Sequence, residues 1–309
     1  MPFVISGVAV FLVLAVLIIS YICYRIVFGG GRYLTDPYHG LDRESMAAYR
    51  ETITKNIDKL LSIPSEEVKI SSHDGAVLFA DYYETREGAP LEIQFHGYRS
   101  MGTHDFSGGA LEALAMGHNL LLVDQRAHGR SGGKSITFGA LESLDCIEWV
   151  HFARKRFGEN IKIILAGISM GAATVLIASS KGLPENVRGI IADCPCSSAG
   201  EIVFREGQKK KLPMRLLMPF VALGARLFGR FRLLDTDVSA AVRHSRVPIL
   251  LIHGEADDFV PCSMSEKIKG DCELVRFERF ADARHGLSYI VDTERYVKLI
   301  KDFSSEVLK

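Results

Sequence analysis

A serine between two glycines is the residue of this 309-residue chain best suited to act as a nucleophile. Ser169 lies in Gly-Ile-Ser-Met-Gly, after an apolar run that ends at Ala166 and before a helix-forming run, residues 172–180. A serine on a tight strand-to-helix turn tolerates its strained backbone only if nearby positions lack bulk, as these glycines do. The following helix directs unpaired N–H groups and its positive dipole end at the serine. This pattern predicts a nucleophile elbow.

A serine hydroxyl needs a base to take its proton and an acid to orient that base. Both residue types follow Ser169 in loops beyond predicted strands. Asp257 follows the apolar run of residues 248–252, and His285 follows the run of residues 273–280. Together the three residue types support attack of Ser169 on an acyl carbonyl, with His285 as base and Asp257 as its partner.

The acid and the base each have rivals in the sequence. Asp258 competes with Asp257 but is one residue too late in its motif. Asp193 ends the strand-like run of residues 189–192 and remains an alternative to Asp257. Three histidines precede a glycine at a predicted strand end and are interpreted as braces for loops: His96, His128 and His253. Others have no partner pattern and are interpreted as surface or packing residues: His39, His104, His118, His151 and His244.

From about Glu66 to its C-terminus the chain resembles the α/β-hydrolase superfamily, close to its esterase, lipase and serine-aminopeptidase-like branch. The order Ser, Asp, His is that of this superfamily. Four motifs carry the resemblance: His96-Gly-Tyr98, Asp124-Gln-Arg-Ala-His-Gly-Arg-Ser131, the sequence around Ser169, and His253-Gly-x-x-Asp257-x-x-Val-Pro261 followed by His285. The resemblance implies that Ser169 is the nucleophile, His285 the general base and then acid, and Asp257 the orienting carboxylate. It also implies an oxyanion hole made by the backbone N–H groups of Tyr98 and Met170.

The activity implied by this resemblance is that of a serine hydrolase that cleaves carboxylic esters through an acyl-enzyme intermediate, with no cofactor and no metal. An insertion rich in Leu, Met and Phe, predicted to line the pocket, favours a small-molecule or lipid-like ester with an apolar acyl chain. A thioester or a small amide or peptide bond remains an alternative substrate. A catalytically silent, membrane-tethered binding scaffold is the alternative from another class, and the complete set of Ser, His and Asp argues against it.

Composition and two further motifs exclude other classes of protein. The 37 basic residues balance the 37 acidic ones, so no overall charge attracts nucleic acid. The sequence Gly132-Gly-Lys-Ser135 resembles part of a phosphate-binding loop, but His128 stands where that loop needs glycine. Cys194-Pro-Cys196 lacks the spacing and the second ligand pair of a zinc site. The six cysteines show no disulfide framework, which favours a reducing compartment.

The elements that must position these residues read as an α/β fold. Strand-like runs occur at about Val68, Val77 and Ile93 and at residues 120–123, 163–165, 190–192, 249–252 and 274–277. From the fourth run onward they alternate with helical stretches such as residues 140–156. This alternation indicates a mostly parallel sheet with helices on both faces. We predict an eight-stranded α/β-hydrolase domain over residues 65–309, with a helical cap insertion at about 197–245.

The N-terminus is unlike that of a soluble hydrolase. Residues 2–24 carry no charge, and as a helix they would reach about 34 Å, enough to cross a bilayer core. No Lys or Arg precedes the run and no small-x-small cleavage site follows, so it predicts a membrane anchor over residues 1–28 rather than a signal peptide. Arg25 and Arg32 follow the run, which places the catalytic domain in the cytoplasm by the positive-inside rule.

A linker over residues 29–64 is predicted between anchor and domain. Gly29-Gly-Gly31 predicts a flexible joint, and an amphipathic helix follows with one apolar face: Met46, Tyr49, Ile53, Ile57 and Leu60. Within the cap, residues 205–232 hold eight basic residues and one acidic residue among Leu, Met and Phe. The simpler interpretation is a lid packed inward, and the alternative is a basic, apolar face that lies on an anionic membrane.

Overall fold

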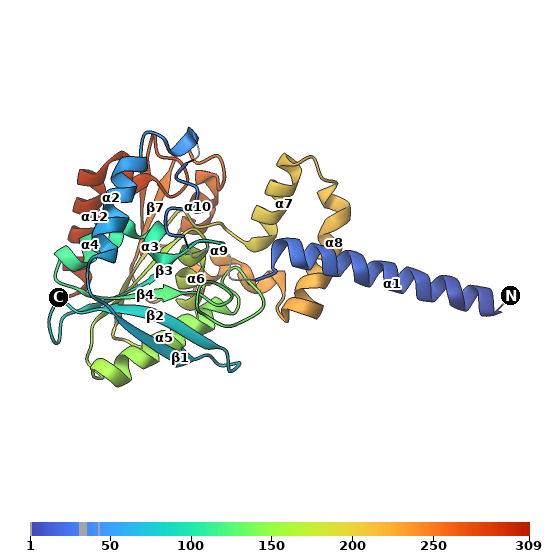
Figure 1. Ribbon diagram of the computed structural model, residues 1–309, viewed down its shortest axis with the longest axis horizontal. Coiled ribbons are helices and arrows are strands. Elements are labelled where there is room, and N and C mark those ends of the chain that lie inside the picture. The colour runs from blue at the N-terminus through green and yellow to red at the C-terminus, as the bar shows by residue number, and fades with distance from the viewer. Residues whose placement is uncertain (1, 31–35, 43) are drawn as a thin grey trace.

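A sheet of eight strands forms the centre of the structure, a computed structural model that describes residues 2–30, 36–42 and 44–309 (Figure 1). The strand order is β1-β2-β4-β3-β5-β6-β7-β8. Strand β2 is antiparallel to β1 and β4, and all other neighbours are parallel. The strands are β1 (Glu66–Ser71), β2 (Val77–Tyr83), β3 (Leu91–Phe95), β4 (Asn119–Asp124), β5 (Ile163–Ile168), β6 (Val187–Asp193), β7 (Ile249–Gly254) and β8 (Val275–Phe280). The predicted eight-stranded, mostly parallel sheet is confirmed.

Helices cover both faces of the sheet. Alternate side chains along each central strand point to opposite faces and belong to two separate apolar cores. On β4, Leu121 and Val123 belong to one core, and Leu120 and Leu122 to the other. Burial on both faces explains why the central strands are continuous apolar runs. The first core lies under α5 (Glu142–Phe157), α6 (Met170–Ala178), α9 (Val238–Val242) and α10 (Cys262–Lys269). The second lies under α2 (Arg50–Leu61), α4 (Ser107–Ala115) and α12 (Thr293–Val307).

The amphipathic helix predicted in the linker is α2. It buries Ile53, Ile57 and Leu60, at the helical spacing of three and four residues that puts side chains on one face. Met46 belongs to a 3₁₀ turn before this helix (Glu44–Met46), and Tyr49 directly precedes the helix. The segment therefore packs onto the domain that contains the sheet instead of spanning a gap between two parts.

The N-terminal helix α1 (Pro2–Val27) projects away from the sheet, as Figure 1 shows. In the part of the chain that the structure describes, it contains the one segment long and apolar enough to cross a membrane, Gly7–Val27. Its C-terminal end is held in place: Ser20, Tyr24 and Phe28 are buried. The Tyr24 hydroxyl lies 2.7 Å from the hydroxyl of Ser135.

The predicted flexible joint at Gly29-Gly-Gly31 is wrong for the two glycines that the structure describes; Gly31 and Arg32 lie outside the described residues. Gly29 forms a β-bridge with Ser135, and the Gly30 N–H donates to the Lys134 carbonyl at 2.9 Å. A Cβ on Gly30 would lie 2.4 Å from that of Ala127. These glycines thus permit close backbone approach, and the sequence that resembles a phosphate-binding loop provides the surface they approach.

The chain between β6 and β7 forms the predicted helical insertion, but this insertion packs on α1. Figure 1 shows α7 (Ala199–Lys209) and α8 (Met214–Gly224) outside the sheet layers, with α8 beside α1. Gly224 allows the contact, because a Cβ there would meet the Ser20 carbonyl at 2.4 Å. The Tyr21 and Phe228 rings meet edge to face, with centroids 5.1 Å apart. The apolar residues of the insertion therefore cover the end of α1.

Candidate active site

The turn between β5 and α6 holds Ser169 in a strained conformation. Its φ of 55° and ψ of −112° lie in a region that side chains rarely adopt. A Cβ on Gly167 would lie 2.3 Å from the backbone of Gly171, and a Cβ on Gly171 would lie 1.7 Å from the Phe95 carbonyl. Because neither contact is possible, both positions require glycine. The turn therefore has the geometry of the predicted nucleophile elbow.

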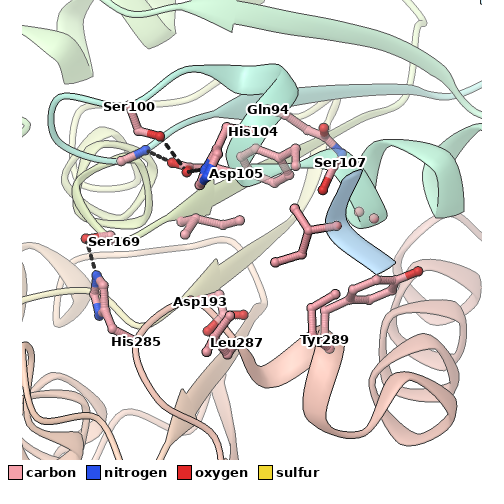
Figure 2. Close-up of a pocket in the computed structure, with 18 of the residues that line it drawn as sticks. Gln94, Ser100, His104, Asp105, Ser107, Ser169, Asp193, His285, Leu287 and Tyr289 are labelled. Carbon is pink, nitrogen blue, oxygen red and sulfur yellow. Dashed lines mark hydrogen bonds and ion pairs between the residues drawn. The ribbon is translucent and has the colours of Figure 1, made fainter. Parts of the chain in front are cut away.

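Three side chains that are far apart in the sequence form one hydrogen-bond chain. The Ser169 hydroxyl lies 2.9 Å from Nε2 of His285, as Figure 2 shows. Nδ1 of the same imidazole lies 2.7 Å from Oδ2 of Asp257. The His285 side chain remains 24% exposed, whereas that of Asp257 is fully buried. This geometry suits proton transfer from the hydroxyl to the imidazole, with the carboxylate orienting the ring.

The environment of Asp257 keeps its carboxylate ionised. Its Oδ1 accepts the N–H groups of Phe259 and Val260 at 2.9 and 2.8 Å. Burial raises the pKa of Asp257, but hydrogen bonds from His253 and His285 outweigh that effect and hold the pKa well below its usual range. His253 also lies 2.6 Å from the Ser265 hydroxyl through Nδ1, so it braces the loop.

Neither rival carboxylate occupies the position of Asp257. Asp258 is exposed and forms an ion pair with Arg284 at 2.6 Å. Asp193 is buried at the end of β6, where its backbone carbonyl accepts the Ser169 N–H at 2.8 Å, and its carboxylate has no hydrogen bond to His285 among the described residues. The geometry therefore favours Asp257 as the partner of the imidazole.

The two residues predicted to form the oxyanion hole flank the serine from different elements. Met170 is the first residue of α6, so its N–H has no acceptor within the helix. Tyr98 follows β3 in a loop that two histidines brace. Nε2 of His96 accepts the Gln125 N–H at 3.1 Å, and Nε2 of His128 accepts the Arg99 N–H at 3.0 Å. Burial, with the neighbouring His96, lowers the pKa of His128 to about 3, which keeps that ring a neutral acceptor.

The same loop is tied to the end of α1. The Tyr98 hydroxyl donates to the Val27 carbonyl at 2.8 Å, and the Arg99 guanidinium donates to the Ile26 carbonyl at 2.9 Å. The last carbonyl groups of a helix have no N–H partner within the helix. Cationic or hydroxyl side chains commonly donate hydrogen bonds to them. The loop that carries one predicted oxyanion donor is thus attached to the apolar helix.

Asp105, in the short helix α3 (Gly102–Asp105), accepts hydrogen bonds from the loop that carries Tyr98. The sequence did not predict a role for this residue. Its Oδ2 accepts the Gly97 N–H at 2.7 Å, and its Oδ1 accepts the Ser100 hydroxyl at 2.6 Å. Burial raises the pKa of Asp105, but the hydrogen bond and charge of His104 and the Ser100 hydroxyl outweigh it, so the pKa falls to about 2. No motif in the sequence marks this residue, because its partners are set by the fold of the loop.

We expect Asp105→Ala to lower kcat by about 10²-fold with a smaller change in KM, because the Gly97 N–H loses its acceptor and the Tyr98 N–H shifts from its position. Asp105→Asn keeps one acceptor oxygen and should recover part of the loss. Steady-state kinetics with a p-nitrophenyl ester measure both effects. Asp271→Ala, at an exposed site, is the control. An unchanged kcat in Asp105→Ala would show that the loop holds its shape without this carboxylate.

A cavity of about 490 Å³ opens beside Ser169 and His285. Its apolar walls come from residues 41–53, from the end of β5 and from the segment after β8, including Leu41, Met46, Ile53, Ile168, Leu287 and Ile290. Among the described lining residues, none belongs to the insertion at 197–245. The expectation that Leu, Met and Phe of a cap line the pocket is therefore wrong. Phe228 of the insertion packs on α1, and residues between Asp36 and Ile53 line the cavity instead.

Cys194 lies close to the hydrogen-bond chain without joining it. Its Sγ and the ligand atoms of Asp257 and His285 all lie within 4.8 Å of one another. Burial raises the pKa of the Cys194 thiol well above its ordinary value, and both nitrogens of His285 already have partners. The Asp257 and His285 atoms of this group therefore serve the hydrogen-bond chain, and the Cys194 thiol lies beside it. All six cysteines are free thiols.

Comparisons with known proteins agree with this architecture. A sequence model described as the α/β hydrolase fold matches residues 93–222. The uncharacterized protein YqkD of Bacillus subtilis is 29% identical over 195 residues, which are 62% of this chain and 63% of YqkD. The uncharacterized protein YfhR of Escherichia coli K12 is 29% identical over 154 residues, 48% of this chain and 46% of YfhR. The matched region thus spans less than two thirds of either relative.

Solved structures with the same fold include esterases. A Pyrococcus furiosus esterase is 26% identical, with a TM-score of 0.67 over 81% of this chain and 94% of the esterase. Est1E of Butyrivibrio proteoclasticus, solved with ferulic acid bound, is 18% identical, with a TM-score of 0.59 over 78% of this chain and 99% of Est1E. The eight-stranded sheet, the strained serine turn and these likenesses lead to one assignment: the chain has the α/β-hydrolase fold.

Proposed function

We propose that this protein is a serine hydrolase that cleaves carboxylic esters. The observation that carries the proposal is the continuous hydrogen-bond chain from the Ser169 hydroxyl through His285 to the buried carboxylate of Asp257. The strained backbone of Ser169 and the glycines on either side of it match the requirements of an exposed nucleophile. Similarity to an esterase of Pyrococcus furiosus adds support for ester substrates.

The proposed reaction proceeds in two acyl-transfer steps. Oγ of Ser169 attacks the ester carbonyl carbon while Nε2 of His285 takes the hydroxyl proton. The N–H groups of Tyr98 and Met170 stabilise the oxyanion, and Asp257 stabilises the imidazolium. The imidazolium then gives its proton to the departing alcohol as the ester C–O bond breaks. Water, deprotonated by His285, attacks the acyl-enzyme and releases the acid and the free serine.

The cavity supports an ester with an apolar stretch next to the carbonyl. Ile168, which directly precedes the serine, and Leu287 line the cavity, and both are apolar. A thioester fits the same chemistry, because the oxyanion donors act on the carbonyl and not on the leaving atom. A small amide needs stronger protonation of its leaving group. Substrate comparison therefore decides among the three bonds.

Covalent labelling and hydrolysis test the proposal together. A fluorophosphonate probe should label the full chain in detergent, and peptide mass analysis should locate the label on Ser169. Hydrolysis of p-nitrophenyl esters of rising acyl length, beside matched thioesters and anilides, should show the ester as the best substrate. If the folded protein takes no label and hydrolyses none of these compounds, a catalytically silent scaffold is the better description.

We also propose that α1 anchors the protein in a membrane with the catalytic domain on the cytoplasmic side, as Arg25 at its C-terminal end favours. The part of α1 before the buried Ser20, residues 2–19, is about 27 Å long, close to the thickness of a bilayer core. Beside it, Leu216 of α8 is 71% exposed. Arg215 and Arg226 are exposed nearby in sequence, so the insertion offers apolar and cationic groups next to the anchor.

We expect a variant that starts at Ser20 to float with vesicles that contain phosphatidylglycerol and to stay unbound with phosphatidylcholine alone. Retaining Ser20 preserves the buried end of α1. Changing Arg215, Arg226 and Arg230 to Glu should weaken vesicle binding by at least about 100-fold, at roughly 1 kcal/mol for each charge near the surface. Liposome flotation measures both effects, and changing the acidic surface residues Glu294, Asp302 and Glu306 to Gln is the control. Equal binding to both kinds of vesicle would argue against an electrostatic surface.

A further inference from the structure

An exposed aromatic ring lies against the imidazole of His285. Phe259 is 37% exposed, and its ring centroid lies 5.0 Å from that of His285 at an interplanar angle of 68°. Two aromatic rings prefer this edge-to-face arrangement, and such a pair stabilises more than the apolar area it buries. Phe259 also lines the cavity that contains Ser169. This ring therefore touches the side chain to which the proposed reaction assigns every proton transfer.

The backbone of Phe259 is fixed to the carboxylate that orients the same imidazole. Its N–H donates to Oδ1 of Asp257 at 2.9 Å, and Oδ2 of that carboxylate lies 2.7 Å from Nδ1 of His285. The next residue, Val260, is buried and donates its own N–H to Oδ1 at 2.8 Å. These hydrogen bonds set the position of the Phe259 backbone relative to the imidazole.

A residue of the insertion also contacts the Phe259 ring. Nζ of Lys209, the last residue of α7, lies 5.8 Å from the ring centroid, within the range of a cation–π contact. The same ammonium donates to the carbonyl of Asp258, the residue before Phe259. Glu206, one turn earlier in α7, forms an ion pair with Lys209 at 2.6 Å. Phe259 is thus held by two elements, its own loop and α7, although its ring is partly open to solvent.

The acyl-enzyme is the state in which the ring contact has the largest effect. Before the reaction, the imidazole is held at both nitrogens, by Ser169 and by Asp257. Once Oγ of Ser169 carries the acyl group it has no proton to donate, so the imidazole keeps its hydrogen bond at Nδ1 and loses that at Nε2. The His285 side chain is 24% exposed, so it is not fully enclosed by other side chains. Its packing against Phe259 then restrains the ring together with Asp257.

We propose that Phe259 is a positioning residue that keeps the His285 imidazole directed at the acyl group while water attacks. Its ring lies against the imidazole and limits rotation about the Cβ–Cγ bond of His285, so Nε2 stays where it can take a proton from the attacking water. The inference rests on the proposed esterase function and adds a residue to that same site.

Steady-state and burst kinetics of the full chain in detergent test the proposal. Because p-nitrophenol leaves readily, release of the acyl group limits the turnover of p-nitrophenyl butyrate. Phe259→Ala should slow this step and lower kcat by about 5- to 10-fold, the upper range for the loss of an aromatic pair. KM should fall with kcat, so kcat/KM, which reports acylation, should change by less than about twofold. The burst of p-nitrophenol and the rate of fluorophosphonate labelling should likewise be retained.

Further variants separate the ring contact from a general loss of structure. Phe259→Tyr keeps the ring and should restore kcat to within about twofold of the wild type, whereas Phe259→Leu should give an intermediate value. Lys209→Met keeps the aliphatic stem, removes the cation and should lower kcat about two- to threefold in a protein that retains Phe259. Lys210→Met, at an exposed neighbouring residue, and Leu274→Ala are the matched controls. Leu274 is 40% exposed and precedes β8, at the sheet edge opposite Ser169.

The outcomes separate this inference from the proposed function. A wild-type protein that takes no fluorophosphonate label and hydrolyses no ester would reject the esterase, and this inference with it. Labelling of Ser169 in the wild type, together with an unchanged kcat in a folded Phe259→Ala protein, would support the esterase and overturn the positioning role. An equal fall of kcat and kcat/KM, or a rise in KM alone, would also overturn it, because the ring would then act on acylation or on substrate binding.

Discussion

Turnover of p-nitrophenyl acetate is expected to fall by about 10⁴- to 10⁶-fold when Ser169 is replaced by alanine. The variant keeps the cavity and the proposed oxyanion donors but has no atom that can form the proposed acyl-enzyme. Because Ser169 lies at a strained φ of 55°, alanine must adopt the same backbone without the hydroxyl, so circular dichroism and thermal unfolding are measured beside the kinetics. Fluorophosphonate labelling should disappear with the activity.

Ser180→Ala is the matched control for this experiment. Ser180 lies just beyond the C-terminal end of α6, and its hydroxyl donates to the Ile177 carbonyl. Removing this hydroxyl therefore changes no contact of His285 or of the cavity. Its kcat/KM should stay within about twofold of the wild type. A Ser169→Ala protein that folds and keeps more than a tenth of the activity would rule out this serine as the nucleophile.

Replacing Asp257 by asparagine is expected to lower kcat by about 10⁴-fold, because the neutral amide cannot stabilise the imidazolium and favours the wrong tautomer of His285. The buried carboxylate accepts four hydrogen bonds, from two histidines and two N–H groups, so the geometry of the loop should largely survive in the amide. Stopped-flow and steady-state hydrolysis from pH 6 to 10 measure the loss.

Two neighbouring carboxylates make this prediction specific. Asp258→Asn breaks only an exposed ion pair with Arg284 and should retain nearly full activity on p-nitrophenyl acetate. Asp193→Asn should cost far less than Asp257→Asn on this short substrate, which does not fill the cavity. A loss at Asp193 equal to that at Asp257 would transfer the role of orienting acid to β6.

The fold and the candidate triad were predictable because their signals are local. Each buried strand is a short apolar run, and the elbow shows its steric requirement as glycines two residues on either side of Ser169. Loops that follow neighbouring parallel strands lie at the same edge of a sheet. The loops that carry Ser169, Asp257 and His285 are therefore expected to lie close together. The structure brings the three side chains within hydrogen-bonding distance.

The features that escaped prediction depend on contacts between distant segments. Tyr24 and Ser135 are 111 residues apart, so no pattern near Gly29 shows that this glycine lies against the loop after β4. The basic insertion was expected over the cavity, yet the end of α1 offers it an apolar partner that only the assembled fold reveals.

In the proposed membrane-anchored protein, the two hydrogen bonds from Tyr98 and Arg99 to the last carbonyls of α1 connect the bilayer-spanning helix to the serine site. Helix tilt responds to hydrophobic thickness, so a thinner or thicker membrane changes the angle at which α1 leaves it. Gly29 and Gly30 form backbone contacts with Ser135 and Lys134, so these two residues do not act as a flexible linker between α1 and the domain. If the proposed anchor and esterase activity are correct, the rate of ester hydrolysis should depend on lipid composition, which assays in detergent and in bilayers of different acyl length would measure.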